Sequence, residues 1–203
     1  MSKFNQITKF YDPANQSNVN SFYEKITLGQ SLKPKMIDGH KTVVLQSINC
    51  QPDTPYLLSF RMAKNCVGSF EVQLSDPVDT SLSSQVIYSF TKNYKQEAPI
   101  NIVFVPYSNF KKFLWTKIDS TLATNNITDI KLYRIKPLQG LPTYKNITKL
   151  GIQARPFTYF LINKEPIRVG RNGIYELEGI NINSIYAAPL AKDNFIIDYR
   201  YED

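Results

Sequence analysis

The residue types that most often carry out enzyme chemistry are scarce in this chain and stand in no recognisable catalytic spacing. There is one histidine, His40, and there are two cysteines, Cys50 and Cys66. A zinc site that used all three would need carboxylate ligands as well. Neither cysteine lies in a signature typical of a nucleophile, although a Cys–His pair remains open. We therefore predict no catalytic residue and no metal site, an ordinary hydrogen-bonded His40, and two reduced thiols, with a bridge between neighbouring strands as the alternative.

Pairs of carboxylates are the other candidates, because glycoside hydrolases work with two of them. Asp119 and Asp129 flank a turn-like stretch, and Glu71 lies within a strand-like run on the side expected to face solvent. Seventeen acids in a β-protein give such pairs readily by chance. The segment from Gly170 to Gly173 is no phosphate loop, since the Walker lysine and its Ser or Thr are missing. We therefore predict that the protein is not an enzyme and that it has no cofactor.

Aromatic side chains give a stronger indication of binding. They make up 13% of the residues, and an exposed ring offers a saccharide a flat apolar face with a polar tip. The candidate glycan-binding residues lie in segments expected at one end of a β-sandwich: Trp115, Tyr94, Tyr107 and Phe110. The alternative is that Trp115 packs in the core, because it shares one face of a predicted strand with Phe113.

The chain of 203 residues carries a formal net charge of +7. Much of the excess lies between Lys92 and Lys136, where eight basic residues face three acids. A basic surface attracts nucleic acid, anionic glycans or acidic proteins, but lysines on solvated strand faces and edges also prevent aggregation. The chain has no nucleic-acid-binding signature, no run near the ~18 apolar residues of a membrane span, and no signal core at its start. We expect neither a nucleic-acid partner nor a membrane span.

Short apolar or alternating runs recur along the chain and predict β-strands. Even spacing with turn residues between the runs is typical of a β-sandwich or barrel, and no long segment keeps a helical period. We expect the continuous run Ile100–Val105 to be a central strand. The runs cover residues 23–28, 40–48, 55–62, 69–74, 85–90, 100–105, 113–118 and 127–135.

The order of these runs resembles the jelly-roll of galactose-binding-like and carbohydrate-binding modules. P-Y-L-L-S-F-R-M-A-K at 55–64 is followed by F-E-V-Q-L at 70–74, by a long strand pair, and by I-T-D-I-K-L-Y-R-I at 127–135. The resemblance covers about residues 20–137. It implies a sandwich whose last strand returns beside its first, with a host-surface glycan as a candidate ligand.

The segment Tyr159–Glu178 consists of short apolar runs separated by turn residues. Asn163 favours a tight turn, and Pro166 belongs at a strand start or on a sheet edge. Gly170 and Gly173 bracket a second turn before an alternating run. We predict a compact β-meander here.

This segment carries a second resemblance, together with L-G-I-Q at 150–153 and F-I-I-D-Y-R-Y-E at 195–202. Its pattern, I-N-K-E-P-I-R-V-G-R-N-G-I-Y-E-L at 162–177, is similar to a C-terminal module of tail and other virion proteins. That module recurs in phages and prophages of Gram-positive and gut bacteria. The resemblance covers roughly the last quarter of the chain and implies a tail, baseplate or head-appendage protein, with no catalytic residues to transfer.

These patterns predict an N-terminal arm (residues 1–19), a jelly-roll β-sandwich (20–137) and a small C-terminal β-module (142–203), because Pro and Gly interrupt pairing between 136 and 142. The expected function is that of a non-enzymatic virion structural protein, assembled in the bacterial host cytoplasm against other virion subunits or further copies of itself. A glycan-binding adsorption protein is the alternative, and a cell-wall or polysaccharide hydrolase comes third. Arg and Tyr anchor interfaces, so the expected assembly contacts are Arg168, Arg171, Tyr175, Tyr199 and Tyr201.

Overall fold

The computed structural model describes residues 4–12, 22–29, 35–37, 41–62, 69–75, 84–91, 98–117, 127–138, 147–179, 181–188 and 194–202. The sixteen elements named in these ranges are all β-strands, which confirms the predicted all-β fold class. Five residues named from the sequence lie outside the described residues: His40, Cys66, Lys92, Tyr94 and Asp119.

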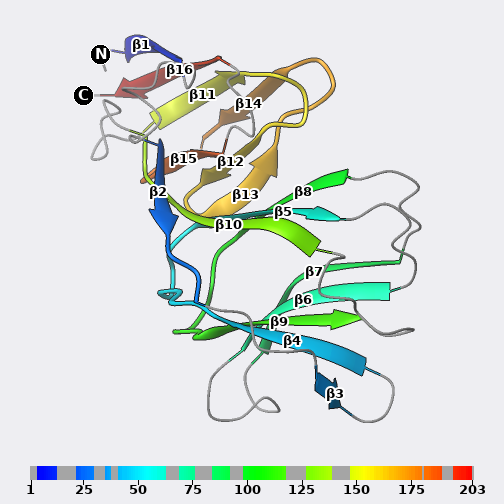
Figure 1. The fold of residues 1–203 in the computed structure, drawn as a ribbon. Helices are drawn as coiled ribbons and strands as arrows, with labels where there is room; N and C mark the ends of the chain where they lie inside the picture. Colours follow the sequence, from blue (N-terminus) through cyan, green and yellow to red (C-terminus); the bar gives the residue numbers. More distant parts are fainter. Residues whose placement is uncertain are drawn as a thin grey trace. The chain divides into compact units, whose positions relative to one another are not determined.

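The strands carry the labels of Figure 1. They are β1 (Phe4–Tyr11), β2 (Tyr23–Ile26), β3 (Lys35–Ile37), β4 (Lys41–Ser47), β5 (Tyr56–Met62), β6 (Ser69–Ser75), β7 (Ser84–Thr91), β8 (Ala98–Phe104), β9 (Lys112–Lys117), β10 (Ile127–Ile135), β11 (Ile147–Gln153), β12 (Tyr159–Ile162), β13 (Glu165–Arg168), β14 (Ile174–Glu178), β15 (Ile185–Ala188) and β16 (Phe195–Glu202).

The chain divides into two compact units. The central unit is Lys25–Arg134, and the terminal unit joins Met1–Glu24 to Ile135–Asp203. The division falls inside β2 and before the last residue of β10, so both ends of the chain belong to the same unit. The expected division had instead placed the N-terminal residues in a separate arm.

The central unit is a β-sandwich. One sheet has the order β2-β10-β5-β8 and the other β3-β4-β9-β6-β7, and Figure 1 shows them as two layers. Alternate residues of β5 point into the space between the layers, where Phe60 meets Trp115 of β9 with ring centroids 5.1 Å apart. Phe104 of β8 meets Phe113 of β9 in the same way at 6.2 Å. The two sheets therefore share a single aromatic core.

The strand order agrees with the expected pattern at one point and differs at another. β10 lies beside β2, so the last strand of the sandwich does return beside the first. β8, however, is an edge strand of its sheet, whereas its apolar run had predicted a central strand. Ile102 and Phe104 face the core, and Val103 and Val105 on the opposite side are half-buried. A continuous apolar run thus records burial on both faces and does not fix a strand's place in the sheet.

The terminal unit also has two sheets around one core. Their orders are β1-β16-β11-β14 and β13-β12-β15. Phe160 of β12 and Phe195 of β16 meet in the core with ring centroids 5.3 Å apart. Leu138 is buried in the same cluster, and its N–H donates to the carbonyl of Ile185 at 2.8 Å. The terminal unit therefore also takes in residues that precede the expected start at position 142.

The largest difference from the sequence prediction concerns the N-terminal arm. β1 pairs with β16 along its whole length, from Phe4 opposite Glu202 to Tyr11 opposite Phe195. The ring of Tyr11 stacks on Phe195 with centroids 4.9 Å apart. Burial, with a smaller contribution from the neighbouring Tyr199, raises the pKa of Tyr11 to about 12. Residues 4–11 are therefore a strand of the sheet rather than a free arm.

The β12–β13 hairpin forms the tight turn that the sequence predicts. Asn163 and Lys164 have φ of 51° and 70°, as a two-residue hairpin loop requires. The Asn163 carboxamide also accepts a hydrogen bond from the N–H of Asn183 at 2.7 Å and donates one to the carbonyl of Asn181 at 2.7 Å. Pro166 lies in the edge strand β13, as predicted.

The predicted meander ends after this hairpin. Gly173 has a φ of 75°, and a Cβ there would lie 2.9 Å from the carbonyl oxygen of Ala154, so the turn requires glycine. The strand that follows, β14, pairs with β11 in the other sheet and not with β13. Turn residues mark where the chain reverses, but not which strand it pairs with next.

Candidate functional site

Two of the four candidate glycan-binding aromatics are core residues. Trp115 is 1% exposed and Phe110 is 0% exposed, so neither ring can present a face to a ligand. The alternative weighed for Trp115, core packing, is therefore confirmed. A backbone hydrogen bond holds Phe110 in this buried position: its carbonyl accepts from the N–H of Cys50 at 3.1 Å.

Tyr107 is the one of the four that the structure shows at the surface, with 60% of its area exposed. Its hydroxyl donates to the carbonyl of Ser84 at 3.2 Å, and its backbone N–H donates to the side chain of Gln85 at 3.2 Å. Its ring packs edge-on against Phe110 at 5.1 Å. Tyr107 is thus a fixed, exposed aromatic side chain of the central unit.

The five candidate assembly residues differ in burial. Tyr199 is 1% exposed and belongs to the core of the terminal unit, so it cannot contact another subunit. Tyr175 and Tyr201 are half-buried against the same core. Arg168 and Arg171 are exposed and remain available. Strand alternation explains why Tyr199 is buried, because Phe195, Ile197 and Tyr199 occupy the core-facing positions of β16.

Arg168 is the centre of what we name the arginine–aromatic cluster: Arg168, Phe157 and Tyr159. The guanidinium carbon lies 4.4 Å from the centroid of the Phe157 ring and 5.5 Å from that of Tyr159. Tyr159 is the direct cross-strand partner of Arg168 in the β12–β13 pair. Cation–π contacts of this kind hold an arginine side chain in place while leaving its N–H donors accessible.

The backbone holds Phe157 in a conformation that favours glycine. Its φ is 70°, its side chain is 44% exposed, and its N–H donates to the carbonyl of Val169 at 2.9 Å. The Val169 N–H donates in turn to the carbonyl of Thr158 at 3.0 Å. Exposed large side chains at positive φ are uncommon and occur preferentially at functional sites. Phe157 carries no signal of this role in the sequence, because nothing in the order of residues shows that it faces Arg168.

The second notable surface is the outer face of the sheet β1-β16-β11-β14, which is the side turned away from the core. Cross-strand partners place its residues in three parallel rows. The apolar row is Phe10, Ile196, Gln153 and Ile174. The carboxylate row is Thr8, Asp198, Gly151 and Glu176. The basic row is Gln6, Arg200, Lys149 and Glu178.

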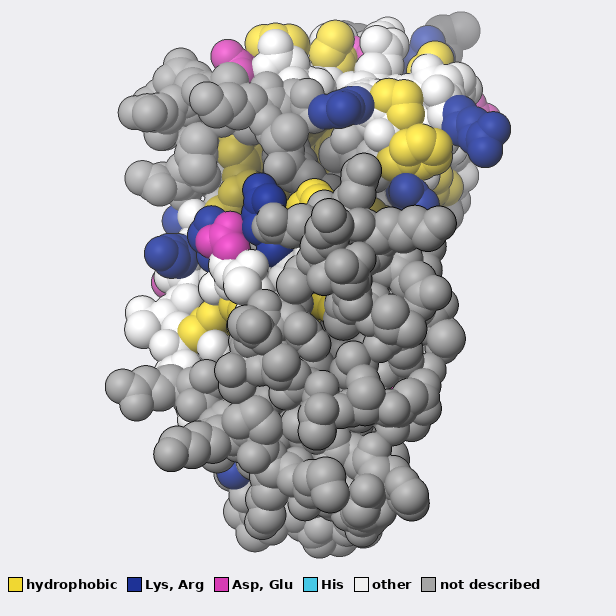
Figure 2. All heavy atoms as spheres, turned by 45° about the vertical axis from the view of Figure 1, so that its right-hand side comes forward, with side chains coloured by type: hydrophobic (Ala, Val, Ile, Leu, Met, Phe, Trp, Pro, Cys, Tyr) yellow, Lys and Arg dark blue, Asp and Glu magenta, His cyan; other side chains and the backbone are white. Residues whose placement is uncertain are grey.

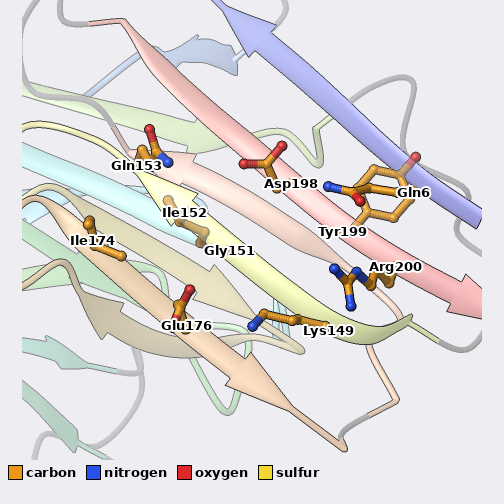
Figure 3. A pocket seen from close by; sticks show the side chains of 10 residues that line it. All are labelled: Gln6, Lys149, Gly151, Ile152, Gln153, Ile174, Glu176, Asp198, Tyr199 and Arg200. Carbon is orange, nitrogen blue, oxygen red and sulfur yellow. The ribbon is translucent and has the colours of Figure 1, made fainter.

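The middle of the outer face is hollowed at Gly151. A hollow of about 170 Å³ lies there, and Figure 3 shows side chains reaching toward it from four neighbouring strands. A Cβ on Gly151 would have its nearest neighbour, the Cβ of Asp198, at 3.7 Å, an ordinary van der Waals distance, so a side chain at this position would extend into the hollow without a clash at its Cβ. Asp198 and Glu176 stand on either side of it as the cross-strand partners of Gly151.

The hollow has an even balance of charge and of hydrogen-bonding groups. Its lining includes two carboxylates, Asp198 and Glu176, and two cations, Lys149 and Arg200. The hydroxyl of Thr8 donates to Asp198, and Lys149 Nζ lies 3.0 Å from a carboxylate oxygen of Glu178. At the top of Figure 2, hydrophobic side chains lie beside Lys and Arg side chains on described residues of the terminal unit.

The carboxylates proposed from sequence do not come together in the described part of the chain. Glu71 lies on β6 and Asp129 on β10, in different sheets of the central unit, and Glu71 accepts a hydrogen bond from Gln73. A hydrogen bond from Lys131 Nζ, 2.8 Å from the carboxylate, lowers the pKa of Asp129. Asp129 is exposed and has a φ of 53°, so this pair belongs to a β-bulge rather than to a catalytic centre.

Cys50 is a free thiol, as predicted, and is fully buried. Burial raises its pKa from 9.0 to about 12, although Lys111 and Arg134 oppose the shift. At pH 8 we therefore expect about a thousandfold less thiolate than in the unfolded chain. Alkylation by iodoacetamide should be very slow in the native protein and fast in denaturant. Fast native alkylation that mass spectrometry maps to Cys50 would contradict this prediction.

The same shift gives a pH dependence of stability. The folded chain keeps its proton on Cys50 between pH 9 and about 12, a range where the unfolded chain loses it. The stability that the protonated Cys50 contributes to the folded state is complete below pH 9, and it declines as the pH rises toward 12. Tyr11, whose pKa is also about 12, acts in the same direction. Denaturant titrations from pH 8 to pH 11 should show the decline, and Cys50→Ala should make it shallower.

Comparison of the chain with protein-family models gave no match, and comparison with curated proteins gave none. Among the described residues, no group of three or more His, Cys, Asp or Glu side chains is arranged to hold a metal ion. The described segments also contain no helix long and apolar enough to span a membrane.

Proposed function

We propose that this chain is a non-enzymatic structural protein of a phage virion, located in a tail, baseplate or head-attached appendage. In this proposal it acts through protein–protein contacts made by its terminal unit. The resemblance of residues 150–202 to a virion C-terminal module supports the setting. The arginine–aromatic cluster is the observation that carries the contact role.

Three properties of the cluster suit an interface. Arginine and aromatic residues supply most interface hot spots, because they bury a large area and keep polar groups that can be satisfied. The stack on Phe157 and Tyr159 restricts the Arg168 side chain before binding, which reduces the entropy lost when a partner binds. Phe157 adds an exposed apolar surface beside the charge. A partner surface that pairs a carboxylate with apolar side chains would complement it.

We expect Arg168→Ala to reduce incorporation of the full-length chain into particles by about tenfold or more, the size of a hot-spot loss. Arg168→Lys keeps the charge but loses the planar stack, so a smaller reduction is expected. The matched control is Arg61→Ala, which removes an exposed arginine of the central unit. Quantitative mass spectrometry of purified particles gives the occupancy. Wild-type occupancy of Arg168→Ala, with the fold intact, would remove the cluster from the assembly contacts.

Cryo-EM of intact particles tests the setting itself. Density for the two units at repeated positions, with Arg168 against a neighbouring subunit, is the expected result. Particles that lack the chain altogether would refute the virion proposal. Truncation after Gln139 is a less direct test, because it removes β16 and so leaves β1 without its partner.

A glycan-binding role for the central unit is the second candidate, and the resemblance of residues 20–137 to carbohydrate-binding modules supports it. Tyr107 is the observation that favours it, since an exposed ring fixed by hydrogen bonds offers a sugar a ready stacking face. A glycan array with the wild type and Tyr107→Ala tests this role. Retention that is the same for both proteins counts against it.

A further inference from the structure

We propose that the hollow over Gly151 on the outer face of the terminal unit is a binding site for a neutral saccharide. This site lies in a different unit from Tyr107 and depends neither on the assembly role nor on the glycan role of the central unit. Its residues come from β1, β16, β11 and β14, which are brought together only by strand pairing.

The charge of the lining points to a neutral ligand. Two carboxylates and two cations line the hollow, so the lining has no net charge, and neither a simple anion nor a simple cation gains a net electrostatic attraction from it. A sugar hydroxyl can donate to a carboxylate and accept from a cation or an amide at the same time. Gln6 and Gln153 add groups that both donate and accept. A neutral molecule with several hydroxyls can bond to both the acceptors and the donors of this lining.

The spacing of the groups also suits a sugar ring. Neighbouring strands are about 4.8 Å apart and successive rows about 7 Å apart, so acceptors of the carboxylate row and donors of the basic row lie within reach of hydroxyls on one ring. The glycine leaves the floor of the hollow free of a side chain, and the space of about 170 Å³ is of the size of one ring.

The apolar row completes the match. Ile174 is 46% exposed and lines the hollow next to Glu176. The C–H face of a sugar ring is apolar and can pack on such a side chain while its hydroxyls reach the polar rows. A site of this kind combines a small apolar contact with several placed polar groups.

The test is a titration of the full-length, isotope-labelled chain with neutral hexoses, N-acetylhexosamines and their short oligomers, followed by NMR. At least one sugar should shift the amide signals of Gly151, Gln153 and Asp198 in a saturable manner. Gly151→Val should weaken that sugar's binding by about tenfold or more, because it fills the hollow and removes several hydrogen bonds. Valine suits a strand position, so the fold should be kept.

Three further proteins make the result specific. Ser89→Val adds the same side chain at an exposed strand position of the central unit and should leave binding unchanged. Tyr107→Ala alters only the candidate site of the central unit, so the saturable shifts of the Gly151, Gln153 and Asp198 amides should stay as in the wild type. Glu176→Gln keeps the shape of the lining but removes a charged acceptor, so it should weaken binding even if Gly151→Val fails to fold.

The inference is overturned if no sugar of the panel shifts these amides, or if Gly151→Val and Glu176→Gln both bind as the wild type does. Loss of binding in Tyr107→Ala alone would assign the sugar to the central unit instead. Tighter binding of glucuronate, or of the zwitterion glycine, than of any neutral sugar would also overturn the inference, because the hollow would then select ionic groups.

Discussion

Trp115→Ala is expected to lower the free energy of unfolding by about 3–5 kcal/mol, as deletion of a large buried side chain does. Trp115 is 1% exposed and packs edge-to-face against Phe60, at 5.1 Å, and Phe113, at 5.8 Å. Phe60 belongs to one sheet of the sandwich and Trp115 to the other, so the substitution opens a cavity between the layers. Urea unfolding followed by circular dichroism measures the loss.

Two comparisons separate this packing role from a binding role. Trp115→Phe keeps an aromatic ring in the core and should cost less. Tyr107→Ala changes an exposed residue and should alter the free energy of unfolding by about 0.5 kcal/mol or less, apart from its one hydrogen bond to Ser84. A Trp115→Ala protein as stable as the wild type would mean that the ring is not part of the core, and would restore it as a candidate sugar platform.

Deletion of residues 1–12, which removes β1, should destabilise the terminal unit by more than the ~2 kcal/mol that burial of one large apolar side chain contributes. The deletion takes away the ring of Tyr11 that covers Phe195, and it leaves the β16 edge without hydrogen-bond partners. An exposed, partly apolar strand edge also invites association with other chains. Thermal unfolding should therefore begin earlier, with aggregation on heating.

The matched control is deletion of residues 1–3, which precede the first described strand and should leave stability unchanged. Amide exchange gives a second readout, because the β1 amides that bond to β16 should be protected in the full-length chain. If deletion of residues 1–12 had no effect on stability, and the β1 amides exchanged freely, the N-terminal segment would be the arm that its sequence predicted.

The sequence alone determined the class of fold and most strand positions. Alternating and β-branched runs are local signals, and they located strands such as β5, β6 and β10 to within a few residues. Turn chemistry is local as well: Asn163 and Gly173 take the positive φ that their types allow, and Pro166 lies on an edge because it lacks an N–H to donate.

The two binding surfaces needed contacts that no local signal contains. Arg168 was selected as an exposed interface residue from its type, but its stacking partner Phe157 lies eleven positions earlier in the chain and was missed. The hollow over Gly151 joins residues between positions 6 and 200. Its charge balance exists only because β1, β16, β11 and β14 pair in one register.

Burial was the other property that only the tertiary structure decided. Aromatic residues such as these are common in binding sites, yet three of the candidates are core residues: Trp115, Phe110 and Tyr199. A large aromatic side chain stabilises a sandwich core as readily as it anchors a ligand, since both depend on removing apolar area from water. Alternation divides a strand's residues between two faces. Only the packing of the second sheet determines which face is closed, and for β1 only the pairing with β16 turned a polar segment into part of the fold.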